Sequence, residues 1–484
     1  MAYRRPVASF AEAEFHWACY SSGCEVCCVL DSQFEIEREY AMKRERMSLL
    51  LKLLVLFSVV AAVGVGFLTV RSFTQRSTAA SMKAALRASG SPLSGEELNE
   101  FYRVPAGETD TTQLWLNATR QVGTDAFNQK VIRLPMFGPG PMPVLPGVEW
   151  PQLDECRTAL ATTLDAEMKA VRIAVAAGGR VRFPVDFRDG VGAELTDTAR
   201  MRFLIRLLAL DCYVAGHDHD SERVIANIRG MFAMSDAIAA EPCLVSQLVR
   251  LSLFGITVRT LQDLFPHCRW SDQELAAIQG DLARADLRAD LQRAVIGEQA
   301  RMMDMLKTAA PDYFRADNEI LAMELYGGIV DACEKPWADC LADCEQVSTR
   351  LDEVWSRKSS KVRYSGVGLL FPAFMDVVEV AAINEARRRA ASVALGMIRQ
   401  EMHAGKLPAS LDQITPAFLE AGPGQVVMTI DPYTGAPLKL RQSDAAIAIY
   451  SVGSDRKSNA GRPGSGEHEG EIDPGFLLER LARK

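Results

Sequence analysis

The chain has 484 residues, 48% of them hydrophobic, which is enough to bury a sizeable core and to form two or three domains. Its formal net charge of −8 argues against a general nucleic-acid binder, because such a protein needs a strongly basic face. Only 7% of the residues are aromatic, and the abundance of Ala, Leu and Arg is typical of packed helices.

Residues 1–46 are expected to be a disordered cytoplasmic tail. The stretch HWACYSSGCEVCC within it holds Cys24 and Cys27, whose spacing suits zinc because a tight turn can direct two sulfurs at one ion. The second Cys or His pair that usually completes such a site is missing, so free or lipidated thiols are an alternative. Translation from Met42 is a further alternative, in which residues 1–41 are not part of the protein.

The apolar run from Leu49 to Val70 predicts a transmembrane anchor at residues 47–72. As a helix, this run would span roughly 33 Å, enough for a bilayer core of about 30 Å. The basic stretch KRER at residues 43–46 precedes it, which favours an N-terminus inside and the rest of the chain outside. A cleaved signal peptide is the alternative, but its apolar region would be only about 7–15 residues long.

Residues 73–151 are expected to form a stalk with one short helix and a proline-rich linker. Ser94 is placed to cap that helix, with Glu96 and Glu97 in its first turn. The stretch 134–151 contains six prolines and three glycines, which favour an irregular connection because proline removes a hydrogen-bond donor and fixes φ.

Residues 152–365 are expected to form a helical domain. Three successive segments between residues 197 and 265 repeat apolar residues at helical spacing, which predicts amphipathic helices joined as hairpins, as in helical-repeat scaffolds. No fixed repeat period is present. Ser271 and Glu274 match a capping box for one long helix at 272–309. Further helices are expected at 317–332, 335–357 and 366–404.

The loop GHDHD at residues 216–220 is the main metal candidate of this domain. His217 and His219, with the aspartates beside them, are residue types that bind metal ions. The loop lies between two predicted helices, where Gly and Asp are also ordinary turn and N-cap residues. The loop is therefore either a metal site or a simple turn. A catalytic metal site would need a third ligand beside the two histidines.

Seven cysteines follow the anchor, an odd number, so at least one thiol is unpaired in any set of intramolecular disulfides. Cys340 and Cys344 share one helix face, but side chains four residues apart on a helix run parallel, which is poor disulfide geometry. With Cys333, they are expected to be core or surface thiols.

Residues 366–484 are expected to hold a long helix, a small antiparallel β-meander and a flexible tail. Apolar runs separated by turn residues predict three strands. These strands lie at 425–430, 437–442 and 446–452. Such a small sheet is only marginally stable alone and needs a covering layer. We expect it to pack on the last turns of the long helix, at 385–404, and not on the hairpins at 195–265.

Three motifs, GKLPASLDQI, DPYTGAPL and IYSVGSD, follow the long helix in this order. With the helix and the meander, they resemble the soluble module of type II secretion major pseudopilins. That resemblance implies an α+β module with an oxygen-rich loop, which often binds calcium in pseudopilins. Here Asp455 and Glu467 would be among the hard oxygen ligands, and a solvated loop is the alternative.

From residue 93 onward, the order of LSGEELNEFY, PVDF, EPCLVSQLVR and the three C-terminal motifs is also similar to a family of membrane-anchored proteins of planctomycete bacteria. The function of that family is uncharacterised. The resemblance therefore implies an envelope protein and supplies no site residues.

The sequence predicts a mainly α protein with a single transmembrane helix, a helical-hairpin domain and a small C-terminal antiparallel meander on a long helix. We expect a non-enzymatic protein of the inner membrane, with a cytoplasmic N-terminus and its bulk in the periplasm. Its expected partners are the membrane and another envelope protein, not nucleic acid, and calcium or zinc are the candidate cofactors. The alternative is a metal-dependent envelope enzyme built on His217 and His219.

Overall fold

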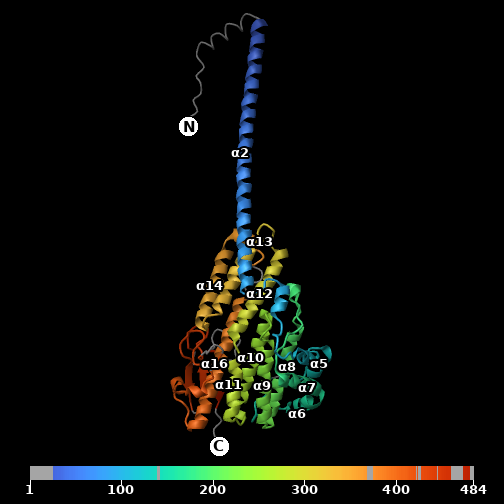
Figure 1. Cartoon of the computed structure of the whole chain (residues 1–484), viewed down its shortest axis with the longest axis vertical. Coiled ribbons are helices and arrows are strands. Elements are labelled where there is room, and N and C mark those ends of the chain that lie inside the picture. Colours follow the sequence, from blue (N-terminus) through green and yellow to red (C-terminus); the bar gives the residue numbers. More distant parts are fainter. Residues whose placement is uncertain are drawn as a thin grey trace. The chain divides into compact units, whose positions relative to one another are not determined.

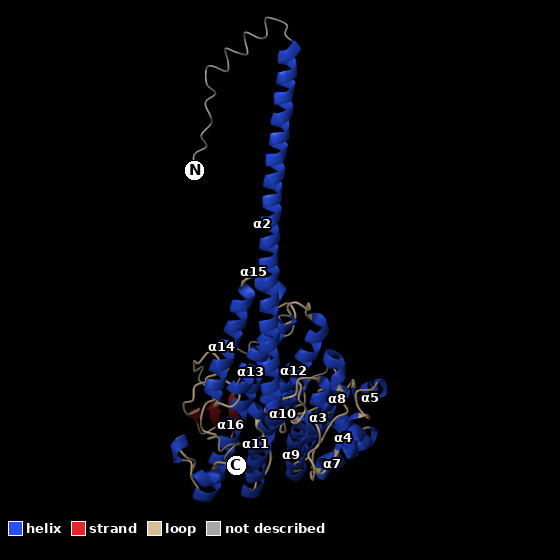
Figure 2. Cartoon of the chain, turned by 45° about the horizontal axis from the view of Figure 1, so that its top comes forward, coloured by secondary structure: helices blue, strands red, loops and turns tan. Residues whose placement is uncertain are grey.

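The computed structural model divides the chain into two compact units, Met1–Thr74 and Gln75–Lys484. The second unit is almost entirely helical, and its few strands lie together in one small sheet (Figure 2). The structure describes residues 25–138, 142–367, 374–420, 422, 427–443, 445–458 and 473–479.

The first unit is described as one helix, α2 (Glu25–Ala88), which continues into the second unit (Figure 1). Its apolar side chains between residues 49 and 70 are all exposed, and Glu39–Ala88 is long and apolar enough to cross a membrane. Exposing so much apolar surface to water is unfavourable, so the helix is compatible with a membrane anchor. Leu244–His267 is also long and apolar enough to cross a membrane, but 61% of its apolar stretch is buried inside the second unit.

The longer elements of the second unit follow one another with short connections. In chain order, the helices are α3 (Gly95–Phe101), α4 (Thr112–Thr119), α5 (Asp125–Val131), α6 (Leu153–Thr158), α7 (Asp165–Ala177), α8 (Thr196–His217), α9 (Ser221–Ile238), α10 (Leu244–Leu264), α11 (Asp272–Arg284), α12 (Leu287–Ala309), α13 (Arg315–Ala332), α14 (Trp337–Ser356), α15 (Lys358–Arg363) and α16 (Phe374–Ala404).

Helices α8, α9 and α10 confirm that the three segments read from the sequence are helical. Met201, Leu204 and Ile205 of the α8 stripe are fully buried. All three helices contact one another and lie side by side in the middle of the second unit (Figure 1). In α8 burial is not confined to one face, because every residue from Leu207 to Gly216 is buried, so this half of the helix is covered on all sides.

The single helix expected at 272–309 is wrong, because the chain breaks between α11 and α12. The capping box of Ser271 and Glu274 is present at the start of α11. Ala285 leaves the helical conformation (ψ 115°), and the Asp286 side chain then accepts a hydrogen bond from the Ala289 N–H at 3.0 Å. An aspartate at this position starts a new helix because it satisfies a free amide of the first turn.

The expected stalk is instead part of the folded second unit. Ser94 caps α3 as predicted, accepting from the Glu97 N–H at 3.2 Å. However, α4 and α5 follow where no helix was expected, and Leu98, Trp115 and Phe127 are buried in the common core. The proline-rich stretch is irregular where it is described, as expected.

Near the C-terminus, β1 (Lys439–Gln442), β2 (Ala446–Tyr450) and β3 (Gly475–Glu479) form an antiparallel sheet in the order β1-β2-β3. The strand expected at 425–430 is wrong: Ile430 makes only an isolated bridge to Pro437, and 425–426 lie outside the described residues. The third strand comes from a segment expected to be a flexible tail.

The pairing of β2 with β3 explains why β3 is part of this sheet. Ile447 faces Leu478, and Ile449 faces Phe476. These four side chains lie on one face of the sheet because alternate residues of a strand share a face, and all four are buried. The apolar face is therefore complete only when the last strand is added.

The sheet packs on α16, as expected, but also reaches α10. Both β2 and β3 contact α16, and the Leu477 N–H donates to Gln262 Oε1 of α10 at 2.9 Å. The turn before β1 is fixed on the first half of α16, where Tyr433 Oη donates to Glu379 Oε1 at 2.9 Å. Met402 in the last turn of α16 is 48% exposed, so the expected docking on the last turns alone is wrong.

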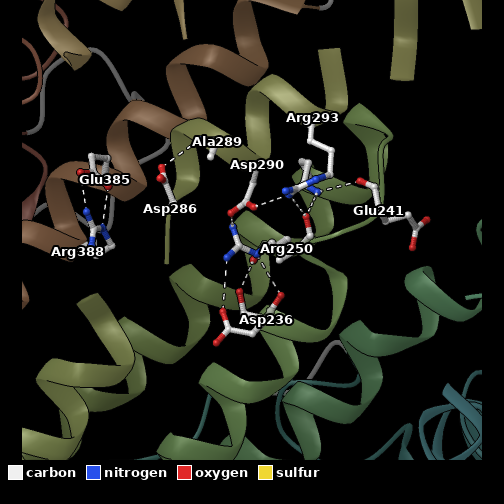
Figure 3. A network of polar contacts seen from close by, with 12 residues as sticks. Asp236, Glu241, Arg250, Asp286, Ala289, Asp290, Arg293, Glu385 and Arg388 are labelled. Carbon is white, nitrogen blue, oxygen red and sulfur yellow. Dashed lines mark hydrogen bonds and ion pairs between the residues drawn. The ribbon is translucent and has the colours of Figure 1, made fainter. Parts of the chain in front are cut away.

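A buried ionic group on α16 ties this module to the helices. Glu385 accepts from Arg388 Nε and Arg389 Nε at 2.7 and 2.6 Å (Figure 3 shows the first pair). The same arginines donate to main-chain oxygens, Arg388 to Leu282 of α11 and Arg389 to Ile430 before β1. Burial opposes ionisation of Glu385, but the two guanidinium groups outweigh it and lower its pKa to about 2.

Replacing Glu385 by Gln should destabilise the protein strongly, because two buried guanidinium groups lose their counter-charge. We expect a loss of about 3–5 kcal/mol in the free energy of unfolding at pH 7. The lowered pKa stabilises the fold above pH 4.5, and that contribution is lost as the pH falls towards about 2. Wild-type stability should therefore decline in this range more steeply than that of Glu385→Gln, as measured by denaturant unfolding.

The matched control for this change is Glu353→Gln. Glu353 forms an exposed ion pair with Arg350 on α14, and such surface pairs contribute only about 0–1 kcal/mol. Equal losses for the two variants would contradict a special role for the buried group.

The β3 strand should stabilise the sheet through Phe476. Phe476→Ala removes a buried aromatic ring, which costs about 3–5 kcal/mol in a protein core. Amide exchange in β1 and β2 should speed up, whereas α8 and α9, which pack chiefly on each other and on α10, should keep their protection. Unchanged exchange in β2 would show that β3 does not hold the sheet.

Candidate functional site

A charged cleft of about 760 Å³ lies in the second unit. Its walls come from the segments after α3 and α7, from α9 and from the start of α12. This volume lies within the usual range of small-molecule sites, about 300–1,000 Å³. Six arginines line it: Arg103, Arg180, Arg182, Arg250, Arg284 and Arg293.

Arg250 forms the floor of the cleft and is only 2% exposed. It extends from α10 and donates to Asp290 of α12 at 2.5 Å and to Asp236 of α9 at 3.5 Å (Figure 3). Its Nε also donates to the Ser235 main-chain oxygen at 3.1 Å. Burial raises the pKa of Asp290, and the positive charge of Arg250 opposes that rise. The floor is therefore a fully bonded ionic cluster that holds three helices together.

A second buried carboxylate supports the wall that carries Tyr102. Glu241 is completely buried and accepts hydrogen bonds from Thr198 Oγ1 and Ser246 Oγ at 2.8 and 2.6 Å. Burial raises its pKa. Tyr102 Oη lies 3.5 Å from Glu241 Oε2 and accepts from the Phe183 N–H at 3.1 Å. This network fixes the aromatic ring of Tyr102 at the edge of the cleft.

Three further arginines lie at the rim of the cleft, and two of them have a carboxylate partner. The guanidinium of Arg182 lies 5.3 Å from the centre of the Tyr102 ring and has no salt bridge to the residues described. Arg293 donates to Asp290 Oδ1 at 3.1 Å and to the Ala239 main-chain oxygen at 3.2 Å, and its side chain is 37% exposed. Arg180 lies 3.6 Å from Glu108.

The net charge of the lining is positive. The six arginines face four carboxylates, from Glu108, Asp236, Asp286 and Asp290, which leaves a formal charge of +2. Asp286 is further engaged as the cap of α12. A partly apolar cleft with guanidinium groups in excess is suited to binding an anion, because guanidinium forms paired hydrogen bonds with carboxylate and phosphate.

The sequence predicted none of these residues as a site. One indication was present: Arg250 interrupts the apolar segment LVSQLVRLSLF, and a charge within an apolar helix face needs a buried partner. The partners Asp236 and Asp290 lie on other helices, so the pattern along α10 alone could not identify them.

The loop GHDHD is used to join α8 and α9. His217 Nε2 lies 2.9 Å from the Val144 main-chain oxygen, and its ring packs 5.3 Å from the centre of Trp150. Asp218 forms an ion pair with Arg157, and Asp220 caps α9 by accepting from the Arg223 N–H. Within the described residues, no group of three or more His, Cys, Asp or Glu side chains could hold a metal ion.

The remaining candidate ligands do not converge either. Cys24 and Glu467 lie outside the described residues, and the side chain of Cys27 is not described. Asp455 is exposed and accepts from the Lys457 N–H at 2.8 Å, which is the geometry of an ordinary turn.

Cys333, Cys340 and Cys344 form a buried cluster where α13 meets α14, so the core alternative for these thiols is correct. Cys333 ends α13, and the other two lie on the first turns of α14. The thiols of Cys333 and Cys344 both donate to the sulfur of Cys340, which lowers the pKa of Cys340, and the nearby Arg288 adds to this effect. The pKa values of the two donor thiols are raised by the same hydrogen bonds and by burial.

No family model, curated protein or solved structure matches this chain. The functional argument therefore rests on the geometry of the cleft and on the anchor.

Cys340 should be the first of the three clustered thiols to ionise. In a pH titration, thiolate absorbance near 240 nm should therefore appear at a lower pH than the value of about 8.5 for an ordinary thiol. Cys340→Ala should remove this early step. Cys156→Ala should leave it unchanged, because burial raises the pKa of Cys156 to about 11. The same titration curve for the wild type and Cys340→Ala would contradict the lowered pKa.

Proposed function

We propose that the protein is a single-pass, membrane-anchored protein of the cell envelope whose helical unit acts by binding. The N-terminus is cytoplasmic and the second unit lies outside the cytoplasmic membrane. The exposed apolar helix α2 supports the anchor. The basic stretch at residues 43–46 supports the orientation, because positive charges remain on the cytoplasmic side.

The observation that carries the binding role is the arginine-lined cleft. Its buried charges, Arg250 with Asp236 and Asp290, are neutralised within the fold. Its six arginines outnumber its four carboxylates, which leaves a net positive charge for a ligand. A floor fixed by buried ion pairs beneath further arginines is the arrangement expected of a preformed binding site.

The C-terminal module offers a second surface for an envelope partner. Asp431 of DPYTG accepts from Ser451 Oγ at 2.8 Å and from the Val452 N–H at 3.0 Å, so the DPYTG and IYSVGSD motifs meet at one buried carboxylate. This junction supports a pseudopilin-like cap, and contact with another protein is the role we assign to it.

A metal-dependent enzyme at His217 and His219 has no observation in its favour. The His217 ring lies against the Val144 main-chain oxygen and Trp150, and no metal-binding group of three or more ligands includes either histidine among the described residues. The binding role is therefore the function that the geometry supports best.

The orientation can be measured with external protease on intact spheroplasts. We expect the chain after residue 73 to be digested and the first 46 residues to be protected. Digestion of the first 46 residues with protection of the remainder would show the opposite orientation and refute the proposed topology.

The basic residues before the apolar run provide a second test of the orientation. Neutralising Lys43, Arg44 and Arg46 to Gln should place part of the molecules in the opposite orientation, since these charges hold the N-terminus inside. The control Arg71→Gln/Arg76→Gln, which removes charges after the apolar run, should leave the orientation unchanged.

A further inference from the structure

We infer that the arginine-lined cleft binds a small organic anion, whose carboxylate or phosphate group lies between Arg182 and Arg293. The inference deepens the proposed binding role by naming the class of ligand. It depends on the shape and charge of the cleft, not on the orientation of the chain in the membrane.

Main-chain hydrogen bonds fix the segment that carries Arg182. The segment that carries it is held by hydrogen bonds to the residues before α4: the Thr111 N–H donates to the Arg180 oxygen at 2.9 Å, and the Arg182 N–H donates to Thr112 Oγ1 at 2.8 Å. Arg180 and Arg182 both line the cleft, together with Val181 between them.

Gly179 allows the arginine segment to lie close to the residues before α4. Its φ is +80°, and a Cβ at this position would lie only 2.6 Å from the Thr109 oxygen and 2.9 Å from Thr111 Cγ2. A larger residue would push the arginine segment away from α4. The wall that presents Arg182 is therefore fixed by backbone contacts, not by the flexible side chain alone.

The lining keeps an excess of positive charge for a ligand, with six arginines against four carboxylates. Asp236 and Asp290 are engaged by Arg250, and Arg293 also donates to Asp290. Asp286 caps α12. Arg182 lies over the Tyr102 ring and feels the negative charge of Asp110, but it forms no salt bridge among the described residues. The 23-residue helix α12 also begins at the cleft, and the positive end of its dipole adds to the attraction of an anion.

The rest of the lining indicates an organic ligand, not a bare inorganic ion. Small side chains of Ala233, Ala237 and Ala240 line one side, and the rings of Tyr102 and Trp115 line another. A volume of about 760 Å³ holds much more than one phosphate. An anion with an apolar body would use both the arginine rim and the alanine wall.

The experiment is titration calorimetry on the full chain in detergent micelles, with phenyl phosphate and phenylacetate as probes. At least one of them should bind at one site per chain, and the preferred probe distinguishes a phosphate ligand from a carboxylate ligand. Arg182→Gln should weaken that binding by about tenfold to hundredfold, since a charge-assisted hydrogen bond to the anion is lost. Arg182→Lys should weaken it less, because the charge is kept and only the paired geometry is lost.

The matched control is Arg120→Gln, an exposed arginine outside the cleft, which should bind like the wild type. Because Arg182 is half-exposed, circular dichroism should show an unchanged fold for both of its variants. The inference is overturned if neither anion binds, if Arg182→Gln and Arg182→Lys both bind as the wild type does, or if benzyl alcohol or inorganic phosphate binds as tightly as the best probe. Such a failure would leave the anchor and its orientation, which are measured separately, unaffected.

Discussion

The burial of Arg250 is the constraint on which the candidate site depends. A guanidinium group taken out of water is costly unless carboxylates surround it, and α10 supplies none beside it. Asp236 must come from α9 and Asp290 from α12, so the three helices are held in one arrangement around the cleft. The same bonds engage both buried carboxylates, and the six arginines of the lining still outnumber its four carboxylates.

The buried Glu385 group holds the C-terminal module on the helices, in the same way as Arg250 holds three helices together around the cleft. Arg388 reaches the end of α11, and Arg389 reaches the residue before the DPYTG turn. In both places a buried charge bonds to segments distant in sequence, and removing one partner would leave the others uncompensated. Alanines on α16, such as Ala386 and Ala390, are fully buried, and their small size leaves room for the long arginine side chains between the packed helices.

Much of the fold could be predicted because its signals are local. Helices α8 to α10 follow from apolar spacing, and the caps at Ser94 and Ser271 follow from residues within one turn. The apolar helix α2 follows from its composition. The candidate site could not be predicted in this way, because Arg250 and Asp290 are 40 residues apart and each alone looks like an ordinary charge on a helix.

The sequence by itself determined which segments are helical, where several of them begin, and that one apolar helix is long enough to cross a membrane. Only the tertiary structure decided that residues 95–151 join the core, that β3 completes the sheet, and that the arginines of five separate segments line one cleft. The physical reason is that local hydrogen bonds and periodicity fix secondary structure, whereas burial depends on partners brought together from distant parts of the chain. Phe476 illustrates this point, since its short strand has no stability until Ile449 lies beside it.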